Sequence, residues 1–151
     1  MFELDGKTAL VTGATRGIGE ASARALDAAG ARVILSGRTA SDLARVASEL
    51  TNEPITLEVD LSPPGAGTQH AEQVLEATGG EGVDIIVNNA GIPMRRTPQE
   101  LSEEDFDLVF SINVRSLLML TIGLAEPMKR REGGSIINIS SVASLRGPLG
   151  R

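Results

Sequence analysis

The sequence predicts an α/β fold in which a parallel β-sheet carries helices on both faces. Short apolar runs alternate with segments of helical periodicity along the chain, which is the pattern of repeated strand–helix units. The length of 151 residues fits a single domain. A content of 41% hydrophobic and 23% charged residues is that of an ordinary globular protein, so we expect a packed core.

Three strands are predicted in the first half of the chain. Residues 8–11 and 32–35 are apolar runs, and a third run at residues 55–59 follows a proline. The helix predicted between the first two strands ends at Gly30, and its apolar face is made of Ile18, Ala21, Ala25, Leu26 and Ala29. The next helix is predicted from the spacing of Leu43, Val46, Ala47 and Leu50.

Two further strands are predicted in the second half. Residues 83–87 form the fourth, after a helix that contains Ala71, and residues 135–139 form the fifth, after a glycine pair. A capping box at residues 102–105 opens a long helix with an apolar stripe of Phe106, Val109, Phe110, Leu117, Leu120 and Leu124. Right-handed crossovers then give a doubly wound sheet of strand order 3-2-1-4-5, with its ligand crevice beyond the carboxyl ends of the strands.

Composition argues against several classes of site. The chain has no cysteine and a single histidine, His70, so we expect no metal site built on thiolate or imidazole ligands. A net charge of -6 argues against nucleic-acid binding, because the only tight basic cluster, residues 129–131, is expected to face solvent at a helix end. The first residues are acidic and polar, and no apolar run approaches the ~20 residues of a membrane span, so we expect a cytoplasmic protein without a membrane partner.

A glycine-rich turn joins the first strand to the first helix. Gly13 permits the tight turn, Gly17 lets the backbone approach a pyrophosphate, and Gly19 allows the helix to pack closely on the strand. The helix N-terminus presents free N–H groups to phosphates. Glycine also forms plain loops, but a strand before and a helix after the turn indicate nucleotide binding. A P-loop would need Gly-Lys-Ser/Thr where this chain has Gly-Ile-Gly.

Four segments together point to one family. The turn at residues 12–19 has the spacing Thr-Gly-x-x-x-Gly-x-Gly, residues 88–91 are Asn-Asn-Ala-Gly, Asn113 lies in the long helix, and residues 138–141 are Asn-Ile-Ser-Ser. In this order and spacing they resemble the short-chain dehydrogenase/reductase family, over residues 7–151. The resemblance implies a Rossmann-like fold and an NAD(P)-dependent oxidoreductase, similar to carbonyl and 3-oxoacyl reductases, that acts on a small carbonyl or alcohol substrate.

The resemblance also assigns cofactor contacts. The implied cofactor-binding positions are Gly13, Thr15, Arg16, Gly17, Ile18, Gly19, Arg38, Asp60, Leu61, Asn88, Ala90 and Gly91. Asp60 and Leu61 would lie against the adenine ring, although Asp60 also suits an Asx turn before two prolines. Asn88 would lie beside the cofactor ribose, and it equally suits a hydrogen bond that ties neighbouring strands together.

Charge at the end of the second strand predicts the type of cofactor. An acidic residue there would bind the ribose 2′-hydroxyl of NAD, whereas this chain has Ser36-Gly37-Arg38. Arg38 and Arg16 suit a 2′-phosphate, because guanidinium groups make charge-assisted contacts with phosphate. We therefore expect NADP, with NADPH preferred over NADH. The alternative is that Arg16 and Arg38 simply face solvent on exposed loops. Arg95 and Arg96 likewise suit either solvent or contact with an acidic substrate.

Asn113 and Ser141 are the candidate catalytic residues. Asn113 lies on the apolar stripe of its helix, where its amide either bonds to backbone at a helix distortion or, by resemblance, holds a water that relays protons. Ser141 matches the serine that orients the substrate carbonyl, with Ser140 as its neighbour. The implied reaction is hydride transfer between the nicotinamide and a carbonyl or alcohol carbon.

The proton donor of the family has no counterpart in this sequence. In the family a Tyr follows the serine by about thirteen residues and a Lys follows about four later, whereas this chain has no Tyr and ends at Arg151. We expect residues 1–151 to be a single, C-terminally incomplete dinucleotide-binding domain, inactive alone, of an enzyme that forms a homodimer or homotetramer. The alternative is a non-catalytic nucleotide-binding or scaffold module. A sugar epimerase or dehydratase fits the glycine spacing less well.

Overall fold

The computed structural model describes residues 3–94, 96–97, 99–131 and 133–141. The elements along the chain are β1 (Thr8–Thr12), α1 (Gly17–Ala28), β2 (Arg32–Gly37), α2 (Ala40–Ala47), β3 (Ile55–Glu58), α3 (Ala66–Ala77), β4 (Ile85–Asn88), α4 (Glu103–Phe110), the π-helix η1 (Ser111–Ser116), α5 (Leu117–Arg130) and β5 (Ser135–Asn138). The strands are parallel and follow the order β3-β2-β1-β4-β5. The predicted fold class and strand order are confirmed, and strand boundaries differ from the expected ones by one or two residues.

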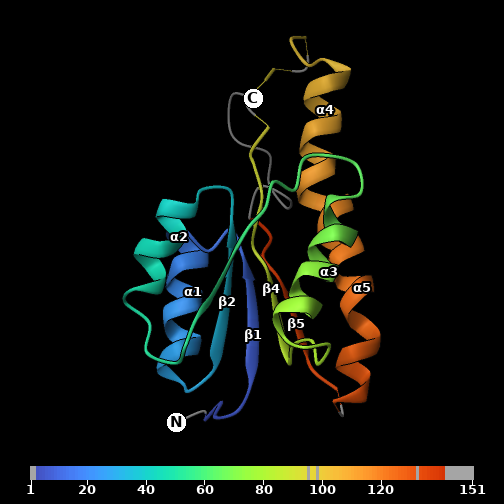
Figure 1. Cartoon of the computed structure of the whole chain (residues 1–151). Coiled ribbons are helices and arrows are strands. Elements are labelled where there is room, and N and C mark those ends of the chain that lie inside the picture. The colour runs from blue at the N-terminus through green and yellow to red at the C-terminus, as the bar shows by residue number, and fades with distance from the viewer. Residues whose placement is uncertain (1–2, 95, 98, 132, 142–151) are drawn as a thin grey trace.

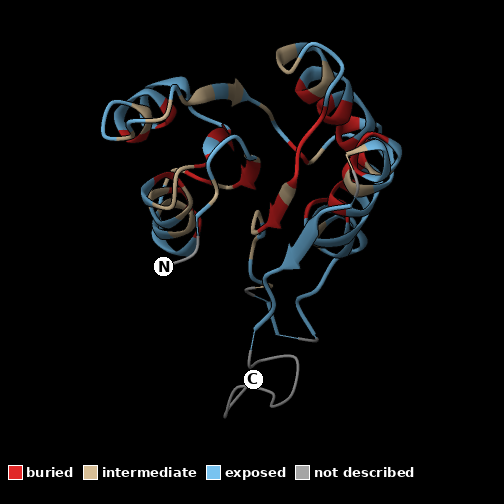
Figure 2. Cartoon of the chain, turned by 90° about the horizontal axis from the view of Figure 1, so that it is seen from below, coloured by how far each residue is buried: buried red, intermediate tan, exposed pale blue. Residues whose placement is uncertain are grey.

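Helices cover both faces of the sheet (Figure 1). Neighbouring strand residues point to opposite faces, so Leu10 and Val11 of β1 belong to two separate clusters of buried side chains. One cluster joins the sheet to α3 and α5, and the other joins it to α1 and α2. Figure 2 shows the buried residues along the sheet and on the inward sides of the helices. Two packed layers on one sheet leave its carboxyl edge open for a site.

The predicted apolar face of α1 is wrong for three of its residues, whereas Leu26 packs against a buried cluster as expected. Ile18 is 61% exposed, and the alanines at 21 and 25 also face solvent. The residues that α1 buries are Gly19, Ala23 and Asp27. The close approach of the glycine turn decides this, because a Cβ at Gly19 would lie 2.1 Å from the carbonyl oxygen of Gly13. Gly19 therefore determines which face of α1 packs on the sheet. The periodicity of the larger apolar residues does not determine it.

The predicted long helix consists of three segments. Its capping box is confirmed: Ser102 Oγ accepts a hydrogen bond from the Asp105 N–H at 3.1 Å, and Asp105 accepts one from the Ser102 N–H at 3.4 Å. The apolar stripe is right only in α5, where Leu117, Leu120 and Leu124 are buried. Phe106 and Phe110 are exposed and stack on each other at 4.2 Å between ring centroids. The π-helical turns shift the phase of the helix, and α4 projects beyond the end of the sheet (Figure 1).

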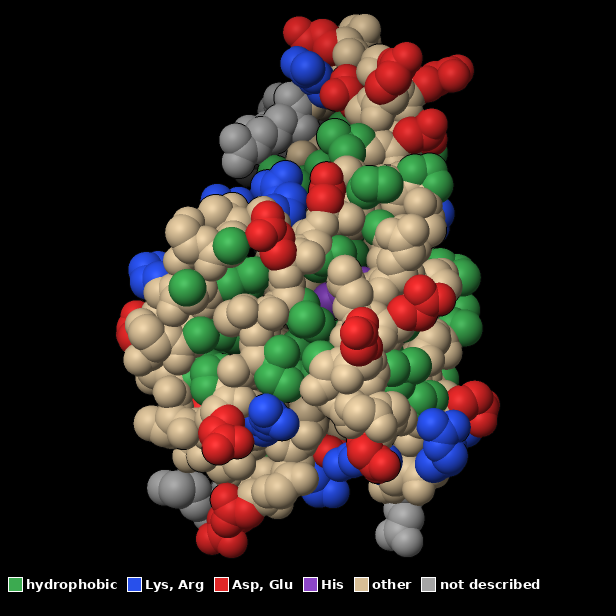
Figure 3. All heavy atoms as spheres, viewed as in Figure 1, with side chains coloured by type: hydrophobic (Ala, Val, Ile, Leu, Met, Phe, Trp, Pro, Cys, Tyr) green, Lys and Arg blue, Asp and Glu red, His purple; other side chains and the backbone are tan. Residues whose placement is uncertain are grey.

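The continuous helical stretch Glu103–Arg130 is long and apolar enough to cross a membrane by length and composition, and 28% of its most apolar 18-residue part is buried. The expectation that no apolar run approaches this length was therefore wrong. Hydroxylated and charged residues interrupt the stretch, but its mean hydropathy of 1.8 remains high. A single such helix is weak evidence for a span. Figure 3 shows hydrophobic side chains along this helix and acidic side chains at its tip.

The last strand lies at the edge of the sheet. Every residue of β5 is exposed, and Ile136 and Ile137 are each 45% exposed. This edge of the sheet is therefore exposed and rich in isoleucine among the described residues. The basic cluster at the end of α5 was predicted to face solvent, which holds for Lys129 and Arg130. Arg131 is different, because its guanidinium donates to the carboxylate of Asp84 at 2.8 Å.

Candidate cofactor and active site

A cleft of about 340 Å³ lies at the carboxyl edge of the sheet. It is bordered by the glycine turn after β1 and by the loops that follow β2, β3 and β4. The predicted cofactor positions that line it are Gly13, Thr15, Arg16, Ile18, Arg38, Asp60, Leu61, Ala90 and Gly91. Segments that are up to 78 residues apart in the sequence therefore meet at the edge where a doubly wound sheet binds its ligand.

Three predicted cofactor positions do not line the cleft. Gly17 is the first residue of α1 and has a φ of 56°, which glycine adopts without strain. Gly19 is buried beneath the turn. Asn88 is buried too, and its Nδ2 donates to Asn138 Oδ1 at 2.9 Å and to Thr121 Oγ1 at 3.0 Å. Asn88 thus ties β4 to β5 and α5, as the structural alternative expected.

The glycine turn is held against the end of β4 by two polar side chains. Thr12 Oγ1 accepts hydrogen bonds from the N–H groups of Asn89 and Ala90, both at 3.0 Å. The Asn89 amide donates to the carbonyl oxygens of Thr12 and Gly13, at 3.0 and 3.1 Å. A Cβ at Gly13 would lie 3.1 Å from the Cα of Ala90. The turn therefore has the close, fixed backbone that a phosphate cradle needs.

Ser36 and Asp42 also line the cleft and were missed by the sequence analysis. The Ser36 hydroxyl is fully buried and has no hydrogen-bond partner among the described residues, although buried polar groups normally have one. An orphaned hydroxyl and a glycine turn at one cleft fit a polar ligand such as a dinucleotide. The sequence placed Ser36 at the end of the second strand, where a serine by itself gives no signal that it is buried or lines a cleft.

Charges of both signs surround this part of the cleft. Arg16 and Arg38 are exposed, and in the described part of the chain neither forms an ion pair, so both guanidinium groups are available to an anion. Asp60 accepts a hydrogen bond from the Ser62 N–H at 2.9 Å, which is the Asx turn of the alternative interpretation. This bond, with a weaker contribution from the Arg38 charge, lowers the pKa of Asp60. Asp60 therefore carries a negative charge at neutral pH.

The amide of Asn113 is bound to the loop after β4. Its Oδ1 accepts from the Ile92 N–H and its Nδ2 donates to the Ile92 carbonyl oxygen, both at 2.9 Å. Asn113 is exposed, so its expected burial on an apolar stripe was wrong. The π-helical geometry of η1 is the distortion that changes its direction. The expected hydrogen bonds to backbone at a helix distortion are present.

The same π-helix holds the loop after β3. Ser116 Oγ donates to the carbonyl oxygen of Leu61 at 2.7 Å, and this bond is buried. Ile112 packs against Leu61 and lines the cleft. A Cβ at Gly67 would lie 2.1 Å from the Ser116 carbonyl oxygen, so α3 packs closely on η1. One short helical segment therefore positions two of the loops that form the cleft.

The predicted substrate side of the site is only partly assembled by the described residues. Ser140 and Ser141 follow β5, whose Asn138 lies opposite Asn88 of β4, and Ser141 is exposed and does not line the cleft. Arg96 pairs with Asp105 at 3.3 Å instead of simply facing solvent. Arg95 lies outside the described residues.

A sequence model of the short chain dehydrogenase family matches residues 7–150. The chain belongs to the short-chain dehydrogenase family. This match confirms the resemblance inferred from the glycine turn, the Asn-Asn-Ala-Gly segment, the helix asparagine and the serine segment. The family consists of oxidoreductases, and its members act on small-molecule substrates.

Curated members of the family are similar over nearly all of this chain. Nodulation protein G of Rhizobium sp. (strain N33) is 44% identical over 100% of this chain and 61% of its own length. L-xylulose reductase of Mesocricetus auratus is 40% identical over 95% of this chain and 56% of its own length. The chain thus spans less than two-thirds of the length of either short-chain dehydrogenase.

Solved structures of short-chain dehydrogenases have the same fold. L-sorbose reductase of Gluconobacter frateurii, complexed with NADPH and L-sorbose, matches with a TM-score of 0.90 at 29% identity, over 98% of this chain and 57% of that one. A metagenomic short-chain oxidoreductase in complex with NADP matches with a TM-score of 0.86 at 36% identity, over 97% of this chain and 66% of that one.

Proposed function

We propose that this chain binds NADP(H) in the cleft and is part of an oxidoreductase that interconverts a carbonyl and an alcohol. The observation that carries the proposal is the cleft itself, where the hydrogen-bonded glycine turn and the guanidinium groups of Arg16 and Arg38, neither of which forms an ion pair with a described residue, border one ligand-sized volume. The similarity to two structures solved with NADPH or NADP supports the choice of cofactor. When bound, the nicotinamide supplies the hydride chemistry.

In this proposal, different residues along the cleft bind different parts of the dinucleotide. The N–H groups at the start of α1 favour a pyrophosphate, because a helix N-terminus carries unsatisfied donors and a positive partial charge. Arg16 and Arg38 bind the 2′-phosphate, and Leu61 offers an apolar wall to the adenine ring. Asp60 keeps its loop in shape through its bond to Ser62, beside that wall.

Asn113 and Ser141 serve the substrate end in this proposal. The Asn113 amide is fixed by Ile92, so it can hold a water at a constant position beside the cleft. Ser141 follows β5 and orients a substrate oxygen by hydrogen bond. The sequence contains no Tyr, so the residues of this chain do not include the family's usual proton donor. We propose that residues 1–151 are one dinucleotide-binding domain, incomplete at its C-terminal side.

Replacing Arg38 by Asp tests the cofactor assignment. A carboxylate at this position repels a 2′-phosphate and can accept a hydrogen bond from a 2′-hydroxyl. We expect Arg38→Asp to weaken NADPH binding by about tenfold or more while NADH binding is unchanged or stronger, measured by cofactor fluorescence. Arg130→Asp, at the far end of α5, is the matched charge change and leaves both affinities unaltered. Equal losses for both cofactors in Arg38→Asp would refute the assignment.

The second candidate is a nucleotide-binding module without catalysis, which the lack of Tyr favours. The two candidates differ in turnover. We expect the whole protein to oxidise NADPH with a small hydroxylated ketone, since the relatives named above include L-xylulose and L-sorbose reductases. Tight NADPH binding with no oxidation across a panel of ketoses and 3-oxoacyl thioesters would support the non-catalytic module instead.

We also propose that the whole protein is a homodimer or homotetramer in the cytoplasm. The exposed apolar side chains along η1 and α5 support self-association, because patches of this kind are uncommon on monomers. They include Val114, Leu118, Met119 and Ile122. Light scattering of the purified protein measures its mass, and cell fractionation tests the compartment. A monomer at micromolar concentration, or recovery with membranes, would contradict these two parts of the proposal.

A further inference from the structure

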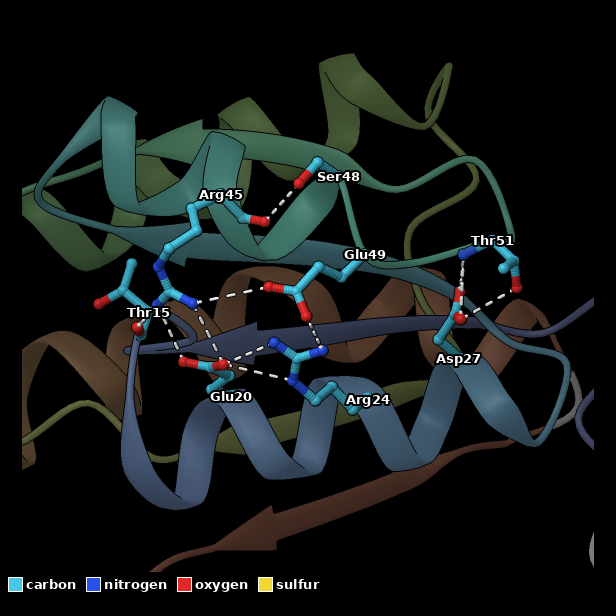
Figure 4. A network of polar contacts seen from close by, with 8 residues as sticks. All are labelled: Thr15, Glu20, Arg24, Asp27, Arg45, Ser48, Glu49 and Thr51. Atoms are coloured by element: carbon cyan, nitrogen blue, oxygen red, sulfur yellow. Dashed lines mark hydrogen bonds and ion pairs between the residues drawn. The ribbon is translucent and has the colours of Figure 1, made fainter.

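An arginine of α2 anchors the glycine turn from outside the cleft. Arg45 Nη2 donates a hydrogen bond to the carbonyl oxygen of Thr15 at 2.8 Å (Figure 4). The same guanidinium donates to both carboxylate oxygens of Glu20, at 3.0 and 3.3 Å. Thr15 belongs to the turn, and Glu20 lies in the first turn of α1. A single side chain therefore joins α2, the turn and the start of α1.

Thr15 is also fixed from the side of the sheet. A Cβ at Gly37 would lie 2.9 Å from Thr15 Cγ2, so the Thr15 methyl group packs on the end of β2. Thr15 is followed by Arg16, and Gly37 is followed by Arg38. The contacts on either side of Thr15 therefore set how the segment that carries Arg16 lies relative to the segment that carries Arg38.

Backbone geometry carries the effect of Arg45 to its neighbour. The peptide unit is planar and trans, so a fixed Thr15 carbonyl also fixes the N–H and the Cα of Arg16. Glu20 in turn holds Arg45, since hydrogen bonds from Arg45 and Arg24 lower the pKa of Glu20 to about 2 and keep it ionised. The Arg45 side chain is 49% exposed, so solvent screens these contacts and the expected effect is modest.

We propose that Arg45 is a positioning residue that holds Arg16 in register with Arg38 and thereby favours NADPH over NADH. The inference rests on the proposed cofactor site. Arg45 does not line the cleft itself, so it acts through the backbone of the turn and makes no contact with the cofactor. Its loss should then affect the ligand that needs both arginines more than the ligand that lacks the 2′-phosphate.

Arg24 provides a matched control for Arg45. Arg24 binds the same two carboxylates, with Nη2 at 2.7 Å from Glu20 and Nη1 at 2.5 Å from Glu49. Arg45 Nη1 lies 3.9 Å from Glu49. Of the two, only Arg45 has a hydrogen bond to the turn in the described part of the chain. Replacing either by Met removes one positive charge from the same network, and only one of the changes releases Thr15.

The experiment compares Arg45→Met with Arg24→Met in the full chain. Each variant is titrated with NADPH and NADH by cofactor fluorescence, and backbone order parameters of residues 15–17 are measured by NMR without ligand. We expect Arg45→Met to lose about three- to tenfold in NADPH affinity and under about twofold for NADH. Order parameters at the turn should fall from ~0.85 toward ~0.6 in that variant alone.

One result would refute the role of Arg45, and a different result would refute the proposed cofactor. If Arg45→Met and Arg24→Met have the same ratio of NADPH to NADH affinity and an equally rigid turn, the role of Arg45 is refuted. If the unaltered chain shows no preference for NADPH, the proposed cofactor is refuted instead. In that case the order parameters alone decide whether Arg45 holds the turn, and a rigid turn in Arg45→Met overturns its positioning role.

Discussion

Asp84 joins the starts of two strands to the end of a helix, on the side of the sheet opposite the cleft. Its carboxylate accepts hydrogen bonds from the Thr8 N–H at 2.9 Å, from Lys7 Nζ at 3.3 Å and from Arg131 Nη2 at 2.8 Å. The side chain is only 6% exposed. Removal of its charge takes an ion-pair partner from Lys7 and leaves Arg131 with the exposed Glu81, 3.5 Å away. This residue therefore links β1, β4 and the chain after α5.

The ionisation of Asp84 makes stability depend on pH. Burial raises its pKa, but hydrogen bonds from Arg131, Thr8 and Lys7 outweigh that effect and hold the pKa below its ordinary value. A group with a depressed pKa in the folded state stabilises the fold above its unfolded pKa, near 3.9 for Asp. This contribution is lost as the pH falls from about 4 through the lower folded pKa.

We expect Asp84→Asn to lower the free energy of unfolding by about 1–3 kcal/mol at pH 7. The amide keeps the shape of the side chain but loses the charge and one acceptor. The variant should also lose less stability than the unaltered chain between about pH 4 and pH 2. Urea denaturation across this range measures both effects. Asp107→Asn, on the exposed surface of α4, is the control and should match the unaltered chain. Equal unfolding energies for all three would contradict this account of Asp84.

The sequence alone predicts the cleft residues that belong to local motifs. It does not predict the roles of residues that act through contacts between distant segments. Gly13 and Arg38 lie at the ends of strands, where the sequence pattern places them. Asn89 lies inside a recognised motif, but its bonds to the turn cross 76 and 77 residues of chain. Arg45 is on a helix whose sequence suggests only a solvated polar face. Its bond to Thr15 depends on how α2 packs beside α1.

At the scale of elements, the π-helix η1 connects the loops that follow β3 and β4. Asn113 binds Ile92, and Ser116 binds Leu61. The capping box of α4 was predictable because Ser102 and Asp105 act within one helical turn. The π-helix was not, since its apolar residues fit an ordinary helix equally well. Its geometry is compatible with packing against α3 at Gly67, which a sequence pattern does not reveal.

Ser116→Ala tests the role of η1 at the adenine end of the cleft. The change removes a buried hydrogen bond and leaves the Leu61 carbonyl oxygen without its partner, so we expect about 1–3 kcal/mol less stability. The loop after β3 should loosen, and NADPH and NADH affinities should fall by the same factor, because both ligands carry adenine. Stability is measured in urea and affinity by fluorescence.

Ser111→Ala is the matched control for this test, because Ser111 lies in the same π-helix and its hydroxyl accepts from Arg115 of that helix rather than donating to the loop after β3. It should leave both affinities unchanged. A loss of affinity in Ser111→Ala as large as in Ser116→Ala would show that general loosening of η1 explains the effect, and that the bond to Leu61 does not.

For the molecule as a whole, most of the exposed large apolar side chains among the described residues lie on α4, η1, α5 and β5, whereas Ile18 lies at the cleft. The exposed isoleucines of β5 and the exposed apolar side chains of α4 and α5 lie outside the two clusters that cover the sheet, whereas Leu120, Leu124 and Met128 of α5 belong to one of them. The cleft is formed mainly by loops after β1, β2, β3 and β4; residues of β1, β2 and β4 are buried in those clusters, and β3 packs on one of them through Ile55 and Leu57. The cleft is therefore built mainly on the well-packed part of the fold.

Direct titration of the unaltered chain with NADPH and NADH, at equal ionic strength and followed by cofactor fluorescence, tests the proposed site most directly. We predict that NADPH binds at least about tenfold more tightly than NADH, because the proposed site pairs Arg16 and Arg38 with the 2′-phosphate. The preference should shrink as salt is added, since exposed charges are screened. Equal affinities for the two cofactors, or no binding of either by folded protein, would contradict the proposed NADP(H) site.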